Sequence, residues 1–487
     1  MKSSPGQLWK KHILYYILIL FLLADLGYSF AQHLSQPLDG DMPNNIVPGN
    51  DVKPILESPL GFATLIKHKS YLGPNRFFAH YPMKKYFEVI PLYLQKFVSP
   101  IDSIYLSCAI AKTLIQLTLI FLLAFAITGN VSFRKPDFLI AAALVTPLFQ
   151  TEGYQSYMGI IDNAPTYAFF YALPVTVLLI YFFPLILQYF HERKPAAQTL
   201  IYILWIPLAL VVSLSGPLNP GIVLIFSLLL FSSGIIRNYF RSDQPGFLKK
   251  ISISILRIPY KYWFYLLPVC FFSLYSLYIG SYNANNIKIP LSELYSRLPA
   301  GIFNPLTKKL GFPVLLLVLA LNQILNSKYF KSSEGKKITN IFKWIGIFAL
   351  VYILLLPIGG YREYRPNVLR YDTLLPVTLC LIFMFGITAF FLVKNLSVRH
   401  KKWYIPLIIG ILLFYTINDE QHFDKNKCER LALKEISESK SDTILLKDDC
   451  LVLSWGKIKK PEDSRLISDL LCKWNVTKVR KFYYNGE

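Results

Sequence analysis

Two aspartates separated by one glycine follow the first apolar segment of the chain, and their types and spacing could do chemistry. Asp39 and Asp41 lie in a run of turn-forming residues, Pro37 to Asp51, where Gly, Pro and Asn bend the backbone. Such a turn can point both carboxylates at a common centre, where they could act as a general base or hold a divalent cation. Mutual repulsion would raise the pKa of one carboxyl. The alternative is an ordinary Asp-Gly turn with solvated side chains.

A cluster of arginines on a later loop could bind an anionic group. Arg362, Arg365 and Arg370 lie close together in the sequence, and Tyr361 precedes them. Guanidinium groups bind phosphate oxygens through paired hydrogen bonds, and a tyrosine suits a lipid headgroup or the face of a sugar. The alternative is that these arginines anchor the protein to headgroups or pair with neighbouring carboxylates.

Three further charged side chains are candidates for substrate contact. Glu152 and Asp162 lie in one short polar loop and could supply a second acid or a metal ligand, or remain solvated loop acids. Arg76 could contact an anionic lipid carrier or simply a headgroup. The sequence contains no GxxxxGK[ST], GxGxxG, HExxH or GxSxG motif, so any chemistry must come from these loops.

Membrane spans are the elements that must position these loops. The chain has 487 residues, of which 54% are hydrophobic and 16% charged, whereas soluble proteins have about 25% charged residues. Apolar runs of about 18 or more residues recur, and each is long enough to cross a bilayer core of about 30 Å. We predict an all-α polytopic membrane protein with about eleven spans. They are expected near residues 13–31, 103–128, 137–150, 165–190, 199–215, 218–236, 263–281, 311–326, 339–358, 373–393 and 403–418.

The placement of Lys and Arg predicts the orientation of these spans. With the N-terminus in the cytoplasm, every expected cytoplasmic joint is basic, while the opposite joints 151–164 and 214–217 carry no Lys or Arg. The C-terminus and the long loop 32–102 are then outside, and a bacterial inner or plasma membrane is the expected location. Because much of the net charge of +22 is explained in this way, we expect membrane lipids and no nucleic acid as partners.

The sequence divides into a membrane part, residues 1–418, and a small soluble α/β unit, residues 419–487, on the outer face. In the unit we predict helices at 428–439 and 462–474 and strands at 443–446, 451–455 and 478–484. Three cysteines lie in this unit. In an oxidising compartment two of them would pair and one would be left over. They are Cys428, Cys450 and Cys472.

The long loop 32–102 is predicted to contain a helix of its own. Residues 83–98 are rich in Tyr, Phe, Leu and Val with scattered charge, which is typical of a helix lying in the membrane interface. Pro91 would kink this helix. The alternative is a loop helix that packs on the bundle.

This pattern resembles the C-type-fold (GT-C) membrane glycosyltransferases, which have many spans, a long first outer loop and acidic residues just after the first span. The resemblance implies a hexosyl- or pentosyltransferase that uses a polyprenyl-phosphate sugar as donor and a glycan, lipid or protein as acceptor. Asp39 or Asp41 would deprotonate the acceptor hydroxyl, and the loop 359–372 would hold the donor phosphate, with or without a metal. The acidic feature here is Asp-Gly-Asp and not the contiguous Asp-Glu of some branches, so which aspartate acts stays open.

Two other functions fit the same sequence. A transporter or flippase for a lipid-linked or anionic substrate would need charges within spans and paired halves; Asp25 and Lys112 are the main such charges, and no repeat is obvious. A non-catalytic scaffold of an envelope complex would dock through residues 419–487 and would not need the Asp-Gly-Asp turn.

Overall fold

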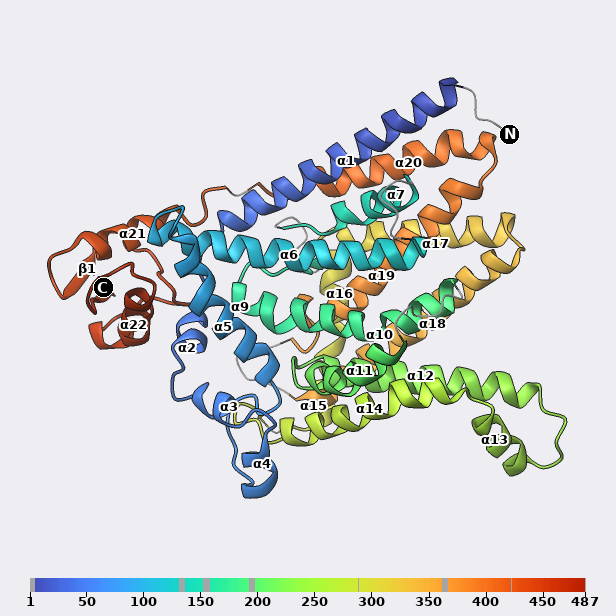
Figure 1. Cartoon of the computed structure of the whole chain (residues 1–487), viewed down its shortest axis with the longest axis horizontal. Helices are drawn as coiled ribbons and strands as arrows, with labels where there is room; N and C mark the ends of the chain where they lie inside the picture. The colour runs from blue at the N-terminus through green and yellow to red at the C-terminus, as the bar shows by residue number, and fades with distance from the viewer. Residues whose placement is uncertain are drawn as a thin grey trace.

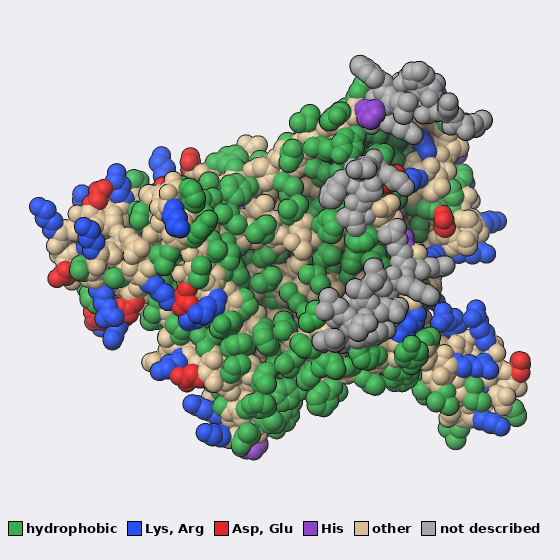
Figure 2. Space-filling view, in the orientation of Figure 1, with side chains coloured by type: hydrophobic (Ala, Val, Ile, Leu, Met, Phe, Trp, Pro, Cys, Tyr) green, Lys and Arg blue, Asp and Glu red, His purple; other side chains and the backbone are tan. Residues whose placement is uncertain are grey.

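The computed structural model describes residues 5–130, 136–151, 158–191, 198–287, 289–360, 367–421 and 423–486. Long helices form a bundle, and a small unit that contains the C-terminus packs at one end of it (Figure 1). Hydrophobic side chains cover the middle of the visible face, while Lys, Arg, Asp and Glu gather at its two ends (Figure 2). This distribution is typical of a protein whose middle lies in the hydrocarbon core of a bilayer.

Eight helical segments in the described part of the chain are long and apolar enough to cross a membrane. They belong to α1 (Pro5–Leu34), α6 (Pro100–Thr128), α9–α10 (Pro165–Tyr167 and Leu173–His191), α12 (Asn219–Phe240), α14 (Tyr260–Gly280), α17 (Gly311–Tyr329), α18 (Ser333–Leu355) and α19 (Tyr371–Asn395). The main part of the chain is therefore an all-α polytopic membrane protein. The number of eleven spans stays a prediction, since α7 (Pro136–Val145), α11 (Gln198–Ser213) and α20 (Val398–Ile417) are not among the eight.

The centre of the bundle is formed by α6, α7 and α19, which pack against one another. Gly386 of α19 allows this close packing, because a Cβ atom at that position would lie 2.6 Å from Ile127 and 2.7 Å from Val145. Small residues at such crossings let membrane helices approach closely when no hydrophobic effect drives them together. The loops at the ends of the bundle thus extend from closely packed helices.

The predicted helix in the first long loop is present, but it begins and ends earlier than expected. It is α5 (Phe77–Leu94), preceded by the short helices α2 (Met42–Ile46), α3 (Lys53–Glu57) and α4 (Phe62–Lys67). One face of α5 buries Met83 and Phe87 and packs against α6, while Val89 and Tyr93 on the other face are exposed. The helix therefore combines the two expected alternatives: it packs on the bundle and also presents an apolar face outward.

The C-terminal unit contains two helices and a two-stranded parallel sheet. Its elements are α21 (Lys427–Glu438), β1 (Thr443–Leu446), a 3-10 turn (Pro461–Ser464), α22 (Arg465–Lys473) and β2 (Phe482–Asn485). In the sheet, Thr443 is opposite Phe482. The strand predicted at 451–455 is wrong: Leu453 has a positive φ of 48°, and its N–H donates to the Glu429 carboxylate and not to a strand. The strand predicted at 478–484 is shorter than expected.

The two ends of the bundle carry different elements (Figure 1). One end carries α2 to α5 and residues 423–486, and we call it the C-terminal-unit end. The opposite end carries the N-terminus, the α17–α18 and α19–α20 joints, and α13 (Phe247–Leu256), and we call it the α13 end. The short helices α15 (Leu291–Ser296) and α16 (Leu298–Thr307) connect α14 to α17.

Candidate functional site

Asp39 lies directly after α1, at the C-terminal-unit end, and is only 3% exposed. Its Oδ1 accepts hydrogen bonds from the Thr166 hydroxyl at 2.7 Å and from the Asp41 N–H at 3.0 Å, and its Oδ2 accepts from the Thr166 N–H at 2.8 Å. Burial raises the pKa of Asp39 to about 6, and the charge of Asp41 adds to this effect, while the hydrogen bonds from Thr166 oppose it. Burial, more than the expected repulsion by Asp41, is thus the main cause.

Asp41 has a different environment from Asp39. It is half-buried at the start of α2, and its carboxylate accepts no hydrogen bond from the described part of the chain. Its backbone carbonyl accepts from the Asn45 side chain at 2.8 Å, which fixes the turn without engaging the carboxylate. The two carboxylates are therefore not equivalent: Asp39 is held by Thr166, and Asp41 is half-buried. That they share one centre stays a prediction.

The segment just before α9, the helix that provides Thr166, holds Asp162 near a buried lysine. Lys112, in the middle of α6 and 1% exposed, donates to the Gln36 side chain at 2.6 Å and to the Asn163 carbonyl. Asp162 accepts from the Ala164 N–H at 2.8 Å. Burial raises the pKa of Asp162 to about 6, while the Tyr371 hydroxyl and the charge of Lys112 act in the opposite direction. Asp39 and Asp162 are thus brought to one end of the bundle by a single loop.

Arg370 forms an ion pair at the start of α19. Its guanidinium lies 2.5 Å from the carboxylate of Asp372, which is 4% exposed. The Arg370 N–H also donates to the Thr373 hydroxyl at 2.9 Å, so this residue helps to begin the helix. The alternative of pairing with a neighbouring carboxylate is therefore realised for Arg370. The candidates Glu152, Tyr361, Arg362 and Arg365 lie outside the described residues.

Arg76 precedes α5 and connects indirectly to the acidic turn. Burial of His80 lowers the pKa of this histidine to about 3, and the positive charge of Arg76 adds to the effect. The His80 Nδ1 lies 2.6 Å from the Asn45 Oδ1, and Asn45 binds the Asp41 carbonyl. Arg76 is thus at the same end as Asp41, and His80 is part of the buried hydrogen-bond network there.

Glu429 of α21 is a buried carboxylate that the sequence did not single out. Its Oε2 accepts from the Leu38 N–H at 2.8 Å and from the Tyr105 hydroxyl at 2.9 Å, and its Oε1 accepts from the Leu453 N–H at 3.0 Å. Burial raises the pKa of Glu429 to about 7, the hydrogen bonds oppose this shift, and Asp39 adds to it. One side chain therefore holds both the acidic turn and a loop of the C-terminal unit.

That loop packs directly on the glycine between the two aspartates. A Cβ atom at Gly40 would lie 2.5 Å from the Trp455 backbone nitrogen and 2.7 Å from its ring, so only glycine fits. The Trp455 ring also lies 6.0 Å from the ring of Tyr167, with 30° between their planes. The C-terminal unit therefore forms one side of the candidate site.

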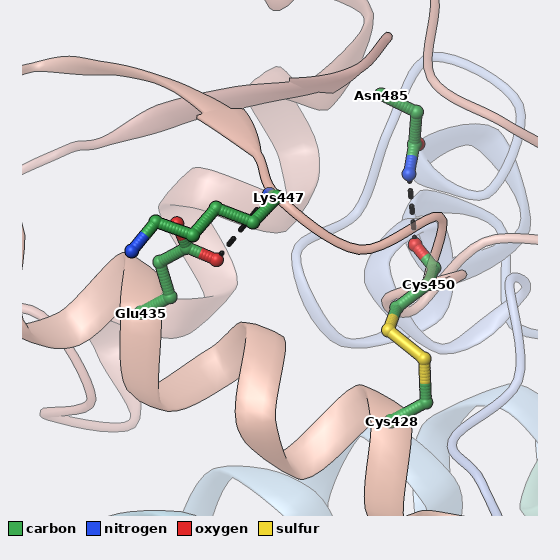
Figure 3. The surroundings of a disulfide bond; sticks show 5 residues. All are labelled: Cys428, Glu435, Lys447, Cys450 and Asn485. Atoms are coloured by element: carbon green, nitrogen blue, oxygen red, sulfur yellow. Dashed lines mark hydrogen bonds between the residues drawn. A yellow bond between two sulfur atoms is a disulfide. The ribbon is translucent and has the colours of Figure 1, made fainter.

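A disulfide holds the base of the Trp455 loop. Cys428 of α21 pairs with Cys450, whose carbonyl accepts from the Asn485 side chain at 2.9 Å (Figure 3). Cys472 is free, so two of the three cysteines pair and one is left over, as the sequence predicted.

No group of three or more His, Cys, Asp or Glu side chains within the described residues could hold a metal ion. The divalent-cation alternative for Asp39 and Asp41 thus gains no third ligand. The described residues also line a groove of about 360 Å³ among α16, α17, α18 and α19. Its lining is apolar, and Leu369 and Leu374 bring it close to Arg370 along the chain.

In comparisons with known proteins, no family model matches this chain, and no curated protein or solved structure matches it. The functional argument therefore rests on the site itself.

Proposed function

We propose that this chain is a membrane glycosyltransferase that moves a sugar from a polyprenyl-phosphate donor to an acceptor hydroxyl at the C-terminal-unit end. One observation carries the proposal: an accessible carboxylate, Asp41, is fixed beside a fully hydrogen-bonded one, Asp39, directly after a membrane span. A buried carboxylate such as Asp39 is costly unless it is hydrogen-bonded, and strongly shifted carboxyl groups cluster at functional sites. The resemblance of the sequence pattern to GT-C enzymes agrees with the same function.

The two aspartates have separate roles in this proposal. Asp41 is the general base, because its carboxylate is free to accept a proton and lies at an accessible turn. Asp39 is the positioning residue, since its oxygens already accept from Thr166 and from the Asp41 N–H. Asp39 thereby fixes the backbone that carries the base.

The donor would lie on the side of α19. A polyprenyl chain is apolar and flexible, and the groove of about 360 Å³ among α16 to α19 has a matching lining. Arg370, next to Leu369 of that groove, would hold the phosphate together with Arg362 and Arg365 of the same loop. Tyr361, Arg76, Glu152 and Asp162 are the further candidate substrate contacts.

The proposed reaction is a direct displacement at the anomeric carbon. The acceptor oxygen forms the new bond to this carbon as the bond to the phosphate oxygen breaks, and the configuration inverts. The hydroxyl proton passes to Asp41. The lipid phosphate leaves with the electron pair of the broken bond, and guanidinium groups stabilise its charge.

We propose an orientation with about eleven spans, the N-terminus in the cytoplasm and the C-terminal unit outside, in a bacterial inner or plasma membrane. The Cys428–Cys450 disulfide supports this orientation, because disulfides persist in oxidising compartments. The excess of basic residues at the α13 end agrees with the positive-inside rule.

The test uses the purified full chain in proteoliposomes with a panel of radiolabelled polyprenyl-phosphate sugars and an extract of envelope glycans as acceptor. We expect sugar transfer by the wild type and a loss of about 10²- to 10⁴-fold in Asp41→Asn. Asp51→Asn, in the same loop but exposed, should keep full activity. Full activity of Asp41→Asn would remove the assignment of the base, and absence of transfer with every donor would remove the proposed function.

A transporter is the second candidate, and one observation favours it. Lys112 is a buried cation inside a candidate span, and it bonds to Gln36 and Asn163. Intramembrane charges often mark substrate or proton paths. Uptake of the same labelled lipids across the proteoliposome membrane, lost in Lys112→Met but kept in Asp41→Asn, would favour the transporter. Absence of both transfer and transport would favour the scaffold.

A further inference from the structure

We infer that Trp455 and Tyr167 form an aromatic subsite for a sugar ring beside Asp41, so that the C-terminal unit is part of the substrate site. The inference rests on the proposed function and adds to it the place and the chemistry of acceptor binding. The ligand class is a neutral pyranose, whose C–H face packs on an aromatic ring.

The backbone around Trp455 is anchored, although the residue is 58% exposed. Two residues before it in the chain, the Leu453 N–H donates to Glu429 at 3.0 Å. Three residues after it, the Ile458 N–H donates to the Asn485 side chain at 3.0 Å. An exposed tryptophan on a mobile loop would be unremarkable, but here the ring is held open while its backbone is anchored.

The anchor of Trp455 is shared with the acidic turn. Glu429 accepts from Leu38, which precedes Asp39, through one oxygen and from Leu453 through the other. The Trp455 backbone then lies against Gly40. The distance between the indole and the Asp-Gly-Asp turn is therefore set by one carboxylate, which is the arrangement that a binding subsite requires.

Tyr167 continues the aromatic surface from Trp455 towards the rest of the site. It follows Thr166, the residue that holds Asp39, and its ring lies 6.0 Å from that of Trp455. Its hydroxyl interacts electrostatically with that of Tyr371, which is also close to Asp162. A sugar stacked on Trp455 would thus have Asp41 on one side and polar groups of the 158–167 loop on the other.

The chemistry of these groups favours a sugar over a lipid chain or an anion. The negative face of an indole attracts the weakly positive C–H groups of a pyranose, and carboxylate and phenol oxygens accept its hydroxyl protons. A sugar placed here would present one hydroxyl to Asp41, the proposed base. The apolar groove among α16 to α19 offers no such polar partners.

The test is saturation-transfer NMR on the full chain in lipid nanodiscs, with methyl α- and β-glycosides of glucose, mannose and galactose as probes. We expect at least one of them to bind to the wild type, about tenfold weaker binding to Trp455→Ala, and retained binding to Trp455→Phe. Leu451→Ala, which removes another exposed apolar side chain of the same loop, is the matched control and should bind as the wild type does.

The outcomes separate this inference from the proposed function. Absence of binding by the wild type, or equal binding by Trp455→Ala and the wild type, would overturn the subsite. Where transfer is measured, Trp455→Ala should raise the acceptor KM about tenfold with little change in kcat or in the donor KM. Sugar transfer that depends on Asp41 but not on Trp455 would support the proposed function and contradict the subsite. Glycoside binding that depends on Trp455, without any sugar transfer, would support the subsite and contradict the proposed function.

Discussion

The two ends of the bundle use charge in opposite ways. At the C-terminal-unit end, acidic groups are buried and bonded: Asp39 to Thr166, Asp372 to Arg370, and Glu429 to two backbone N–H groups. At the α13 end, residues 237–261 carry six basic residues and one acid, Asp243. The comparison indicates that charges at the first end fix geometry, while those at the second end meet water and lipid headgroups.

Exposed apolar residues occur at both ends, but their neighbours differ. Around α13, Phe240, Leu248, Leu256 and Tyr260 are each more than three-quarters exposed, next to the basic side chains. This combination is typical of a helix that lies in the membrane interface. At the opposite end, the exposed Trp455 lies beside polar and acidic groups, which is typical of a binding site and not of an anchor.

The largest stability effect is expected from the disulfide, which should matter at the C-terminal-unit end alone. Replacing Cys428 and Cys450 by serine should cost about 3 kcal/mol, because the bond closes a loop with a sequence separation of 22 residues. Thermal unfolding of the purified protein, followed together with proteolysis of the C-terminal unit, measures this. Cys472→Ser is the control and should change nothing, since Cys472 is free. Equal stability of the Cys428/Cys450 variant and Cys472→Ser would contradict a stabilising role of the disulfide at the C-terminal-unit end.

Glu429→Gln should have the next largest effect, a loss of about 1–3 kcal/mol, because the amide places an N–H against a backbone donor. The pH dependence has a defined sign. The raised pKa of Glu429, about 7 against 4.5, means that the folded protein binds the proton more tightly. This group's contribution to stability is therefore full below pH 4.5 and is lost as the pH rises to about 7. Unfolding midpoints across this range should show a shallower slope in Glu429→Gln than in the wild type, with the remaining slope due to Asp39 and Asp162, whose pKa values are also raised.

The pH profile of sugar transfer should sharpen the difference between the two aspartates. Below about pH 6, Asp39 becomes protonated and holds Thr166 and the turn less well. The rate should then fall by up to about tenfold per pH unit. Initial rates of sugar transfer between pH 5 and 8, each divided by the rate at pH 8, measure this fall. Asp39→Asn should lose this limb of the profile, and a limb that persists unchanged in this variant would assign it to another group.

The smallest effect is expected at the α13 end. Exchanging Lys249 and Lys250 for glutamine should change the free energy of unfolding by less than about 0.5 kcal/mol, because both lie on a helix that projects from the bundle. The same variant should bind anionic lipid more weakly, by about 1 kcal/mol per lysine. Native mass spectrometry with phosphatidylglycerol measures this binding. A stability loss as large as that of Glu429→Gln would show that α13 is structural.

Much of the fold could be predicted because its signals are local. Apolar runs identify the membrane helices, and in the C-terminal unit β1 and α21 lie at or within one residue of the predicted positions. The strand predicted at 451–455 failed because its apolar residues do not pair with another strand: the Leu453 N–H donates to Glu429, and Leu453 has a positive φ. Tertiary contacts decided this segment, and the local sequence does not contain them.

The candidate site could be predicted only in part for a related reason. The Asp-Gly-Asp spacing identified the turn, but the partner of Asp39 is Thr166, in α9 and more than a hundred residues later. Glu429 lies 391 residues after Leu38, and no spacing rule reaches so far. Lys112 was visible as a charge inside a span, and that signal could have indicated that a polar cluster surrounds it.

The contact between Gly40 and Trp455 has a consequence for the synthesis of the protein. The acidic turn is made within the first tenth of the chain, while Glu429 and Trp455 follow only after all the helices of the bundle. A ribosome-bound chain therefore carries an incomplete site through most of its insertion into the membrane. The proposed site can form only once the last segment has folded back on the first loop, so the proposed activity would begin only after assembly is complete.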